Sequence, residues 1–385
     1  MEFHTTKEQE RIRSAIRDIC RDFPGEYWQE LDAQRRYPEK FVKIMTEGGW
    51  LAALIPEEYG GIGVGTVEAS IILEEIHHSG GNAAACHAQM YIMGTLLRHG
   101  SDQQKQRYLP GIAKGDVRLQ AFGVTEPNAG SDSTRIETTA VRKGDGYIVN
   151  GQKIFISRVQ HSDLMLLLAR TSDYDEKNRA GNLSVLLVDL NEAGDAVKAS
   201  PIDTMVNHET NVLHIEDLEV PAENRIGEEG EGFRYIISGM NVERVLIAAE
   251  CIGDARFFID HATTYAKERE VFGRAIGQNQ GVQFPIADAY AQTEAADLMR
   301  YKAAVGIDAG RKIGAEANMA KYLASEAAWK AANVCMDVFG GYGMAQEYDI
   351  ERKFRESRLY KIAPVTNSLI LSFIGHNVLG LPKSY

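Results

Sequence analysis

The sequence predicts an α+β protein with more than one domain, because the pattern of apolar residues changes twice along its 385 residues. Helical spacing of apolar residues continues from Thr6 to about Lys114. Short apolar runs typical of β-strands follow from about Leu119 to Ile226, and long helical segments resume at Phe233. A chain of this length is too long for one small core. We therefore expect a helical domain at residues 1–117, a β domain at 118–227 and a second helical domain at 228–385.

Composition and charge narrow the class of protein. Hydrophobic residues make up 44% of the chain and charged residues 25%, which is ordinary for a soluble globular protein. A net charge of -12, with no basic run to offset it, argues against binding to nucleic acid. No segment is long and apolar enough for a membrane span, and the N-terminus begins directly with an amphipathic helical pattern. We therefore expect a soluble, cytoplasmic protein.

Neither a metal site nor a disulfide framework is expected. The four cysteines are scattered without short spacings, a pattern that suits a reducing compartment. They are Cys20, Cys86, Cys251 and Cys335.

A glycine-rich segment in the first helical region resembles a dinucleotide-binding loop. Residues 60–65 read GGIGVG, but they follow Pro-Glu-Glu-Tyr rather than a β-strand. We therefore expect a plain turn between two helices, with a second break in the helical pattern at Ser79 to Asn82.

The central β region contains a candidate ligand-binding loop, FGVTEPNAGSD, at Phe122 to Asp132. Its proline lacks an N–H and fixes φ, so the segment continues neither a helix nor a central strand. Its small residues leave backbone N–H groups and the Thr125 and Ser131 hydroxyls available to a ligand. The alternative is a surface turn without a function.

A second candidate segment, NGQKIFIS, lies at Asn150 to Ser157. Asn-Gly between two apolar runs suits a tight turn, since both residues tolerate positive φ. We therefore predict a β-hairpin that turns at Asn150–Gly151 and brings Phe155 and Ser157 to the polar loop. Further strands are predicted at 164–168, 183–188 and 212–215, with turns at 143–146 and 172–175.

The second helical region has a cationic break near its first glycine. Arg269 to Arg274 reads REVFGR and ends a long helix, and Gln280 follows shortly. Arginines can hold a pyrophosphate bidentately, and Phe272 offers a ring face to an adenine. The alternative is a helix C-terminus with cations that favour the helix dipole and a glycine that ends the helix.

Glu243 is the candidate catalytic carboxylate. It shares one helix face with Gly239, Met240, Leu246 and Ile247, which are three or four residues away. A carboxylate on an apolar face is costly, so it must be paired, protonated or used for chemistry.

Five segments together resemble the acyl-CoA dehydrogenase family, and the resemblance covers essentially the whole chain. The first two are the polar loop at 122–132 and FIS at 155–157. The other three are ERVLIA at 243–248, EREVFGRAIGQNQ at 268–280 and FGGYG at 339–343. The resemblance implies an N-terminal helical domain, a central β-barrel or sandwich domain and a C-terminal four-helix bundle. It also implies FAD as the cofactor.

The resemblance assigns two groups of residues to FAD. Thr125 would hydrogen-bond the pyrimidine edge of the flavin and Ser157 its N5 region, while Phe155 would pack on the ring. The family usually has tryptophan where Phe155 stands and threonine where Ser157 stands. The full set of cofactor positions is Phe122, Val124, Thr125, Ser131, Phe155, Ile156, Ser157, Arg269, Phe272, Gln280, Asp337, Gly340, Gly341, Thr366 and Ser368.

The second group would hold the ADP half of a neighbouring subunit's FAD, so the resemblance implies a homodimer or homotetramer. Arg269, Phe272 and Gln280 would contact the ADP, and Gly340 and Gly341 would allow close approach of the backbone. At residue 337 an aspartate stands where a glutamine is common, which weakens that contact.

The family reaction removes the α-proton of an acyl-CoA thioester with a glutamate and passes the β-hydride to flavin N5. Most members carry this base two residues before a threonine near the C-terminus, which is Pro364 here. A minority, including isovaleryl-type and long-chain-type members, carry it on the long helix just before an arginine, which is Glu243 here. The resemblance thus implies Glu243 as the base, in a dry pocket that makes a carboxylate basic enough.

Pro364 also removes a backbone donor. The N–H at this position normally helps to hold the thioester oxygen, and proline has none. Val365 replaces a common glycine, so a neighbouring amide could take over. Ser131, Asn241 and Arg244 would line the substrate channel together with Pro364 and Val365.

The leading hypothesis is an FAD-dependent dehydrogenase that forms a trans-2-enoyl-CoA and is reoxidised by an electron-transferring flavoprotein. One alternative is a flavin oxidase, desulfinase or lyase on the same scaffold, suggested by the changes at Pro364 and Val365. The other is a catalytically silent flavoprotein, which the presence of Glu243 disfavours.

Overall fold

The computed structural model describes residues 5–383, which form two compact units. The first unit contains residues 5–34, 65–83 and 241–383, and the second contains 35–64 and 84–240. Both the helical regions and the central sheet that the sequence predicts are present. The domain boundaries expected at residues 117 and 227 stay a prediction.

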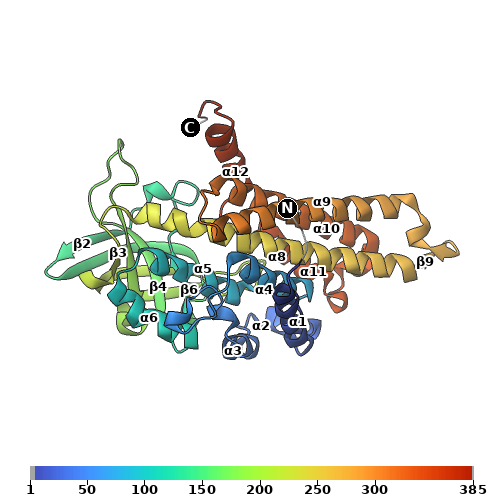
Figure 1. Ribbon diagram of the computed structural model, residues 1–385, viewed down its shortest axis with the longest axis horizontal. Helices are drawn as coiled ribbons and strands as arrows, with labels where there is room; N and C mark the ends of the chain where they lie inside the picture. The colour runs from blue at the N-terminus through green and yellow to red at the C-terminus, as the bar shows by residue number, and fades with distance from the viewer. Residues whose placement is uncertain (1–4, 384–385) are drawn as a thin grey trace. The chain divides into compact units, whose positions relative to one another are not determined.

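The first unit is helical. Its three longest helices are α8, of which residues 241–268 belong here, and α9 and α10, which pack against each other (Figure 1). Thr6 caps α1 through its side chain, and one apolar stripe of this helix is buried against α4. The helices with residues in this unit are α1 (Lys7–Arg21), α2 (Gly25–Gln34), α4 (Thr66–His78), α8 (Gly232–Glu268), α9 (Gln280–Asp308), α10 (Gly314–Phe339), α11 (Ile350–Leu359) and α12 (Asn367–Phe373).

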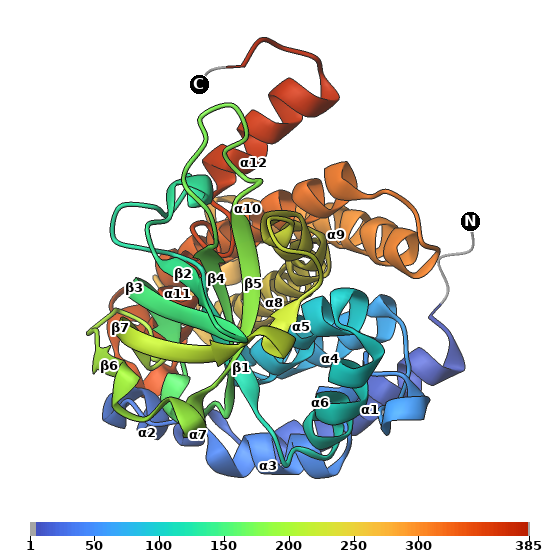
Figure 2. The same cartoon turned by 90° about the vertical axis from the view of Figure 1, so that its left-hand side faces the viewer.

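The second unit is built on an eight-stranded sheet in the order β6-β7-β3-β2-β4-β5-β8, with β1 paired in parallel to β4 (Figure 2). Helices α3 (Glu39–Glu47), α5 (Ala84–His99), α6 (Asp102–Lys114) and the short α7 (Leu190–Ala193) belong to this unit. The strands are β1 (Leu119–Gly123), β2 (Thr139–Lys143), β3 (Gly146–Ser157), β4 (Leu164–Arg170), β5 (Leu183–Asp189), β6 (Val197–Pro201), β7 (Thr210–Pro221) and β8 (Arg225–Ile226).

The sequence of strand β4 is an unbroken apolar run because both faces of the strand are buried. Leu164, Leu166 and Leu168 lie in a core cluster with residues of α5 and α6, whereas Met165 and Leu167 lie in a second cluster with residues of β3 and β7. Because successive side chains of a strand point to opposite faces, both faces of β4 are buried. The central β-barrel or sandwich character expected for this region follows from these two cores.

The predicted hairpin at Asn150–Gly151 is wrong, because β3 passes through these residues as one continuous strand. The pairing of β3 with β7 shifts register between Val149 and Gly151, where Asn150 faces two residues of β7, Glu216 and Asp217, so β7 carries a bulge opposite the Asn-Gly pair. Asn150 Oδ1 accepts a hydrogen bond of 2.8 Å from the backbone N–H of Asp217 on β7. The chain turns earlier, at the Gly144–Asp145 loop between β2 and β3, where Gly144 has a φ of 58°.

The predicted breaks between the helices are confirmed. The glycine-rich segment before α4 is a turn without a preceding strand, and α4 ends before Ser79. No helix within residues 5–383 has the length and apolar character needed to cross a membrane. All four cysteines are buried and form no disulfide among the described residues.

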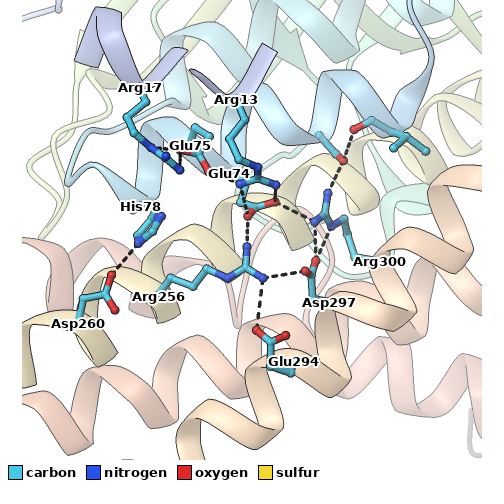
Figure 3. A network of polar contacts seen from close by, with 12 residues as sticks. Arg13, Arg17, Glu74, Glu75, His78, Arg256, Asp260, Glu294, Asp297 and Arg300 are labelled. Carbon is cyan, nitrogen blue, oxygen red and sulfur yellow. Dashed lines mark hydrogen bonds and ion pairs between the residues drawn. The ribbon is translucent and has the colours of Figure 1, made fainter. Parts of the chain in front are cut away.

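A buried ionic network, the Glu74 network, connects α4 with α1, α8 and α9 in the first unit (Figure 3). Glu74 is fully buried and pairs with Arg13 at 3.0 Å, with Arg300 at 2.8 Å and with Arg256. Asp297 pairs with both Arg256 and Arg300. Burial opposes ionisation of Glu74, but the three arginines outweigh it and lower the pKa of this carboxyl to about 2.

Candidate functional site

The polar loop after β1 is a tight turn. Glu126 and Ala129 exchange backbone hydrogen bonds of 3.1 and 3.2 Å, which leaves Pro127 and Asn128 exposed at the corner. The carbonyl of Thr125 accepts a hydrogen bond of 2.9 Å from Ile154 N–H, so the loop lies beside the end of β3. The structure therefore brings the two segments singled out in the sequence together.

A buried ion pair fixes this loop to the sheet. Lys153 Nζ is 2.8 Å from Glu126 Oε1 and also donates to the carbonyls of Val124 and Leu168. The Glu126 carboxylate further accepts the N–H of Thr138 at 3.0 Å. Burial lowers the pKa of Lys153 to about 8, although Glu126 raises it. Burial opposes ionisation of Glu126, but Lys153 outweighs it and its pKa lies below the ordinary value.

The end of β3 presents an exposed aromatic ring. Phe155 has a φ of 60° and lies in a second bulge, where the pairing with β7 shifts between Ile154 and Ile156. A bulge re-aims side chains, and the Phe155 side chain is 60% exposed. Ser157 ends the strand with its hydroxyl 3.5 Å from that of Thr210. Positive φ in a bulky residue is strained, which is common where a residue serves a ligand.

The remaining predicted cofactor residues of the second unit lie around this loop. Phe122 is on β1 and contacts the ring of Tyr91 edge-on at 5.8 Å. Val124 and Ile156 are buried, whereas Ser131 is exposed.

In the first unit, Glu243 lies on α8 as the sequence predicted, and only 4% of it is exposed. Arg244 is buried beside it and donates a hydrogen bond of 2.9 Å to Asn241 Oδ1. Burial lowers the pKa of Arg244, and the charge of Glu243 works against this. The helix thus carries an acid and a base out of water at adjacent positions.

The predicted segment around Pro364 is also in the first unit and is half-buried. Its carbonyl at Val365 accepts a hydrogen bond of 2.8 Å from Lys321 Nζ of α10. Thr366 caps α12 with its side chain, which accepts the N–H of Leu369 at 3.3 Å, and Ser368 is exposed in the first turn.

The Arg269–Arg274 segment directly follows the end of α8 and forms a small β-hairpin. It is therefore more than the simple helix C-terminus considered as the alternative. Strands β9 (Glu270–Val271) and β10 (Arg274–Ala275) pair around Phe272 and Gly273, which have φ values of 55° and 77° (Figure 1). Two successive positive φ angles are typical of a primed hairpin turn. Phe272 is fully exposed at its tip.

The hairpin lies next to the predicted Gly340–Gly341 turn. The Arg269 guanidinium is 5.8 Å from the centre of the Tyr342 ring, which follows these glycines. Asp337 at the end of α10 and Gln280 at the start of α9 are exposed. No atom would lie within 4 Å of a Cβ at Gly340 or Gly341.

Of the three fully buried lysines among the described residues, two contact the segments of the candidate site, and sequence reasoning missed both although a signal for each was present. Lys153 is in phase with Tyr147 and Val149 on the inward face of β3. Lys321 lies on a stripe of buried small residues of α10 that includes Ala317 and Ala324. Within residues 5–383, no cluster of histidine, cysteine or carboxylate side chains could hold a metal ion.

Comparison with known proteins covers nearly the whole chain. Residues 6–116, 121–218 and 230–379 match the family models for the N-terminal, middle and C-terminal domains of acyl-CoA dehydrogenase. The chain is 35% identical over 391 residues to acyl-CoA dehydrogenase FadE12 of Mycobacterium tuberculosis, with 100% of this chain and 99% of that protein covered.

Solved structures agree in fold. A complex of glutaryl-CoA dehydrogenase with glutaryl-CoA has a TM-score of 0.92 and 32% identity, over 100% of this chain and 98% of that one. A chain from a structure of the electron transferring flavoprotein of Acidaminococcus fermentans has a TM-score of 0.93 and 33% identity, over 98% and 100%. From its three matched domains and its full-length relatives, the chain belongs to the acyl-CoA dehydrogenase family of oxidoreductases.

Proposed function

We propose that the protein catalyses FAD-dependent α,β-dehydrogenation of an acyl-CoA to the trans-2-enoyl-CoA. The observation that carries this proposal is Glu243, a carboxylate kept out of water on α8, in a chain whose usual base position is Pro364. Membership of the family supports the reaction class. The position of the base and the residues of the site are part of the proposal.

Glu243 would take the α-proton of the thioester. The electron pair of the broken Cα–H bond then forms the double bond as the β-hydrogen leaves with its own pair. FAD, when bound, supplies the acceptor for this hydride. A positioned general base contributes about 10²- to 10⁴-fold to such a proton transfer.

The residues around the polar loop fit FAD. Phe155 offers an exposed ring in a strained backbone conformation, and the Lys153–Glu126 pair holds the Thr125 loop beside it. A flat, partly apolar ring system with a polar edge matches an aromatic face next to hydroxyl and amide groups. Thr125, Phe155 and Ser157 would hold the flavin, and Arg269 with Phe272 would hold the ADP of a neighbouring subunit's FAD.

Two neighbouring backbone N–H groups can replace the donor that Pro364 lacks. The N–H groups of Val365 and Thr366 have no acceptor among the residues that the structure describes. Either group can donate to the thioester oxygen in place of the missing donor. Asn241, Arg244 and Ser131 would line the acyl-CoA channel.

Two partners complete the proposal. An electron-transferring flavoprotein would reoxidise the flavin, and a second copy of the chain would complete each ADP site in a homodimer or homotetramer. The exposed Phe272 at the hairpin tip supports the second partner, because an exposed large aromatic is common at a contact surface.

The test is anaerobic mixing of the purified flavoprotein with a panel of saturated acyl-CoAs. We expect loss of the oxidised flavin absorbance together with formation of the enoyl-CoA. Absence of bleaching with every straight, branched and aryl acyl-CoA would overturn the proposal. Rapid turnover with oxygen as the sole acceptor would favour the oxidase that the changes at Pro364 and Val365 suggest.

A further inference from the structure

We propose that Lys321 is a positioning residue for proton abstraction, because its ammonium group holds the Pro364–Thr366 segment on α10 beside Glu243 and Arg244. This inference rests on the proposed function. The contacts that support it all lie within the first unit.

Lys321 is the link between α10 and the segment. Its side chain is fully buried, and Nζ donates hydrogen bonds of 2.8 Å to the Val365 carbonyl and 2.8 Å to Asn367 Oδ1. Hydrogen bonds from a charged donor are shorter and stronger than neutral ones. One buried cation therefore fixes both the segment, at Val365, and the first residue of the helix that follows it, Asn367.

The neighbouring contacts restrict the same segment from both ends. Asn367 Nδ2 donates to Ser325 Oγ at 3.0 Å and to Glu326 Oε1 at 2.8 Å. Glu326 also accepts from Lys361 Nζ at 2.9 Å, and the Asn367 N–H donates to the Lys361 carbonyl at 3.1 Å. With both ends held, Val365 is the middle of the segment, and only Lys321 holds it among the described residues.

The hydrogen bond from Lys321 to the Val365 carbonyl also orients the N–H of the next residue, Thr366. The carbonyl and the N–H of one trans peptide unit point in opposite directions. Since the Val365 carbonyl points toward Lys321 on α10, the Thr366 N–H of the same peptide points away from α10. That N–H is one of the two donors that can replace the one missing at Pro364.

Ionisable and polar groups from three helices surround the ammonium group. On α8 these are Glu243, Arg244 and Cys251, on α10 it is Glu326, and on α12 the neutral Asn367 accepts a hydrogen bond. Burial, together with the nearby Arg244, lowers the pKa of Lys321 to about 8 against the effect of the acidic groups. The charge is therefore lost within an accessible range of pH.

A purely structural lysine is the competing explanation. Most buried neighbours of Lys321 along α10 are alanines, and apolar residues would fill such a stripe without the cost of burying an ammonium group. An ammonium group that only filled space would change stability when replaced, but it would not change how the rate depends on pH. The experiment separates these two readouts.

The experiment compares Lys321→Met with Lys330→Met in the FAD-loaded protein. Lys330 lies on the same helix but at the surface, where it pairs with Asp288. The measurements are the melting temperature, the FAD content and the rate of anaerobic flavin reduction at saturating acyl-CoA, from about pH 6 to about pH 10. We expect Lys321→Met to reduce the flavin between about 10 and 100 times more slowly, because misplacement of reacting groups costs this much.

The pH profile is the decisive readout. We expect the wild-type and Lys330→Met rates to fall as the pH rises through about 8, and the Lys321→Met rate to lack this step. The acyl-CoA concentration that gives half of the maximal rate should differ little between the wild type and Lys321→Met. Lys321→Arg, which keeps its charge at every pH tested, should restore part of the rate without the step.

Three outcomes would overturn the inference. A Lys321→Met protein that matches the wild type in rate and pH profile removes it, as does a wild-type rate that stays constant across the alkaline range. The second result decides the matter even if both Lys321 variants fail to fold. If no acyl-CoA reduces the wild-type flavin, the proposed function fails first and this inference falls with it.

Discussion

At the scale of single residues, we predict that replacing the Glu243 carboxylate slows the reaction. Glu243→Gln keeps the size of the side chain but removes the base, so the rate of anaerobic flavin reduction should fall about 10²- to 10⁴-fold. Stopped-flow absorbance with a good acyl-CoA substrate measures this rate. Glu268→Gln is the matched control, because Glu268 is the exposed last residue of the same helix. A Glu243→Gln protein that keeps the wild-type rate would show that another group is the base.

Phe155 has a strained backbone conformation, with positive φ, and is also proposed to contact the flavin. Asparagine tolerates positive φ better than phenylalanine, so Phe155→Asn should leave the melting temperature of the protein without FAD unchanged or higher. The same change should weaken FAD binding by about 2- to 12-fold, since an aromatic contact contributes about 0.5–1.5 kcal/mol. Thermal melting and a fluorescence titration of FAD measure the two effects. Equal affinity in both proteins would exclude stacking on Phe155.

Burial of single residues was predictable only where a pattern marked it. Glu243 stood out because its helical neighbours are apolar, and it is buried as expected. Lys153 and Lys321 sit equally deep, but a lysine in a strand or helix usually keeps its ammonium group in water. Which lysine finds carbonyl and carboxylate partners depends on segments that are distant in sequence, such as Val124 and Val365.

At the scale of elements, β3 shows where local reasoning failed. Asn-Gly favours a tight turn in isolation, but β7 offers a long strand that pairs on both sides of the pair. Ladder hydrogen bonds over the whole strand outweighed the local preference, and a bulge absorbed it. The strands with continuous apolar runs were predicted correctly, because their burial on both faces leaves no ambiguous position.

The same bulge yields a stability prediction. A Cβ at Gly151 would lie 2.4 Å from Thr138 Oγ1 and 2.7 Å from Thr138 Cα, so Gly151→Ala forces β3 away from Thr138, the residue before β2. We expect a loss of about 1–3 kcal/mol in the free energy of unfolding, measured by urea denaturation. Gly281→Ala on α9 is the control, since no atom would lie within 4 Å of its Cβ, and it should be neutral or stabilising by up to about 1 kcal/mol. Equal stability of the two variants would contradict the close packing at Gly151.

At the scale of the whole molecule, the Glu74 network joins helices that are far apart in sequence (Figure 3). Glu74→Gln leaves Arg13, Arg256 and Arg300 without their shared carboxylate. We expect a loss of about 3–5 kcal/mol in the free energy of unfolding, because breaking a buried pair leaves uncompensated charge. Glu294→Gln, at a half-exposed position that also contacts Arg256, should cost at most about 1 kcal/mol.

The network also makes stability depend on acid. The pKa of Glu74 is about 2 in the fold and 4.5 as its ordinary value, so the folded protein binds this proton less readily than the unfolded chain. The stabilisation is complete above about pH 4.5 and is lost as the pH falls toward 2. In full it amounts to about 3 kcal/mol, of which about 2 kcal/mol is lost between pH 5 and pH 3, and Glu74→Gln should remove this part from the difference in unfolding free energy between those two pH values. An unchanged pH dependence in this variant would contradict the assignment.

The burial of the cysteines makes the protein convenient for site-specific labelling. Burial raises the pKa of Cys20 and of Cys335 to about 12, and that of Cys251 well above its ordinary value. Maleimides react with thiolates, which these groups scarcely form at neutral pH. A single Val141→Cys substitution would place a reactive thiol on the exposed side of β2, away from the proposed sites, so a fluorophore or spin label could be attached there without first removing the native cysteines.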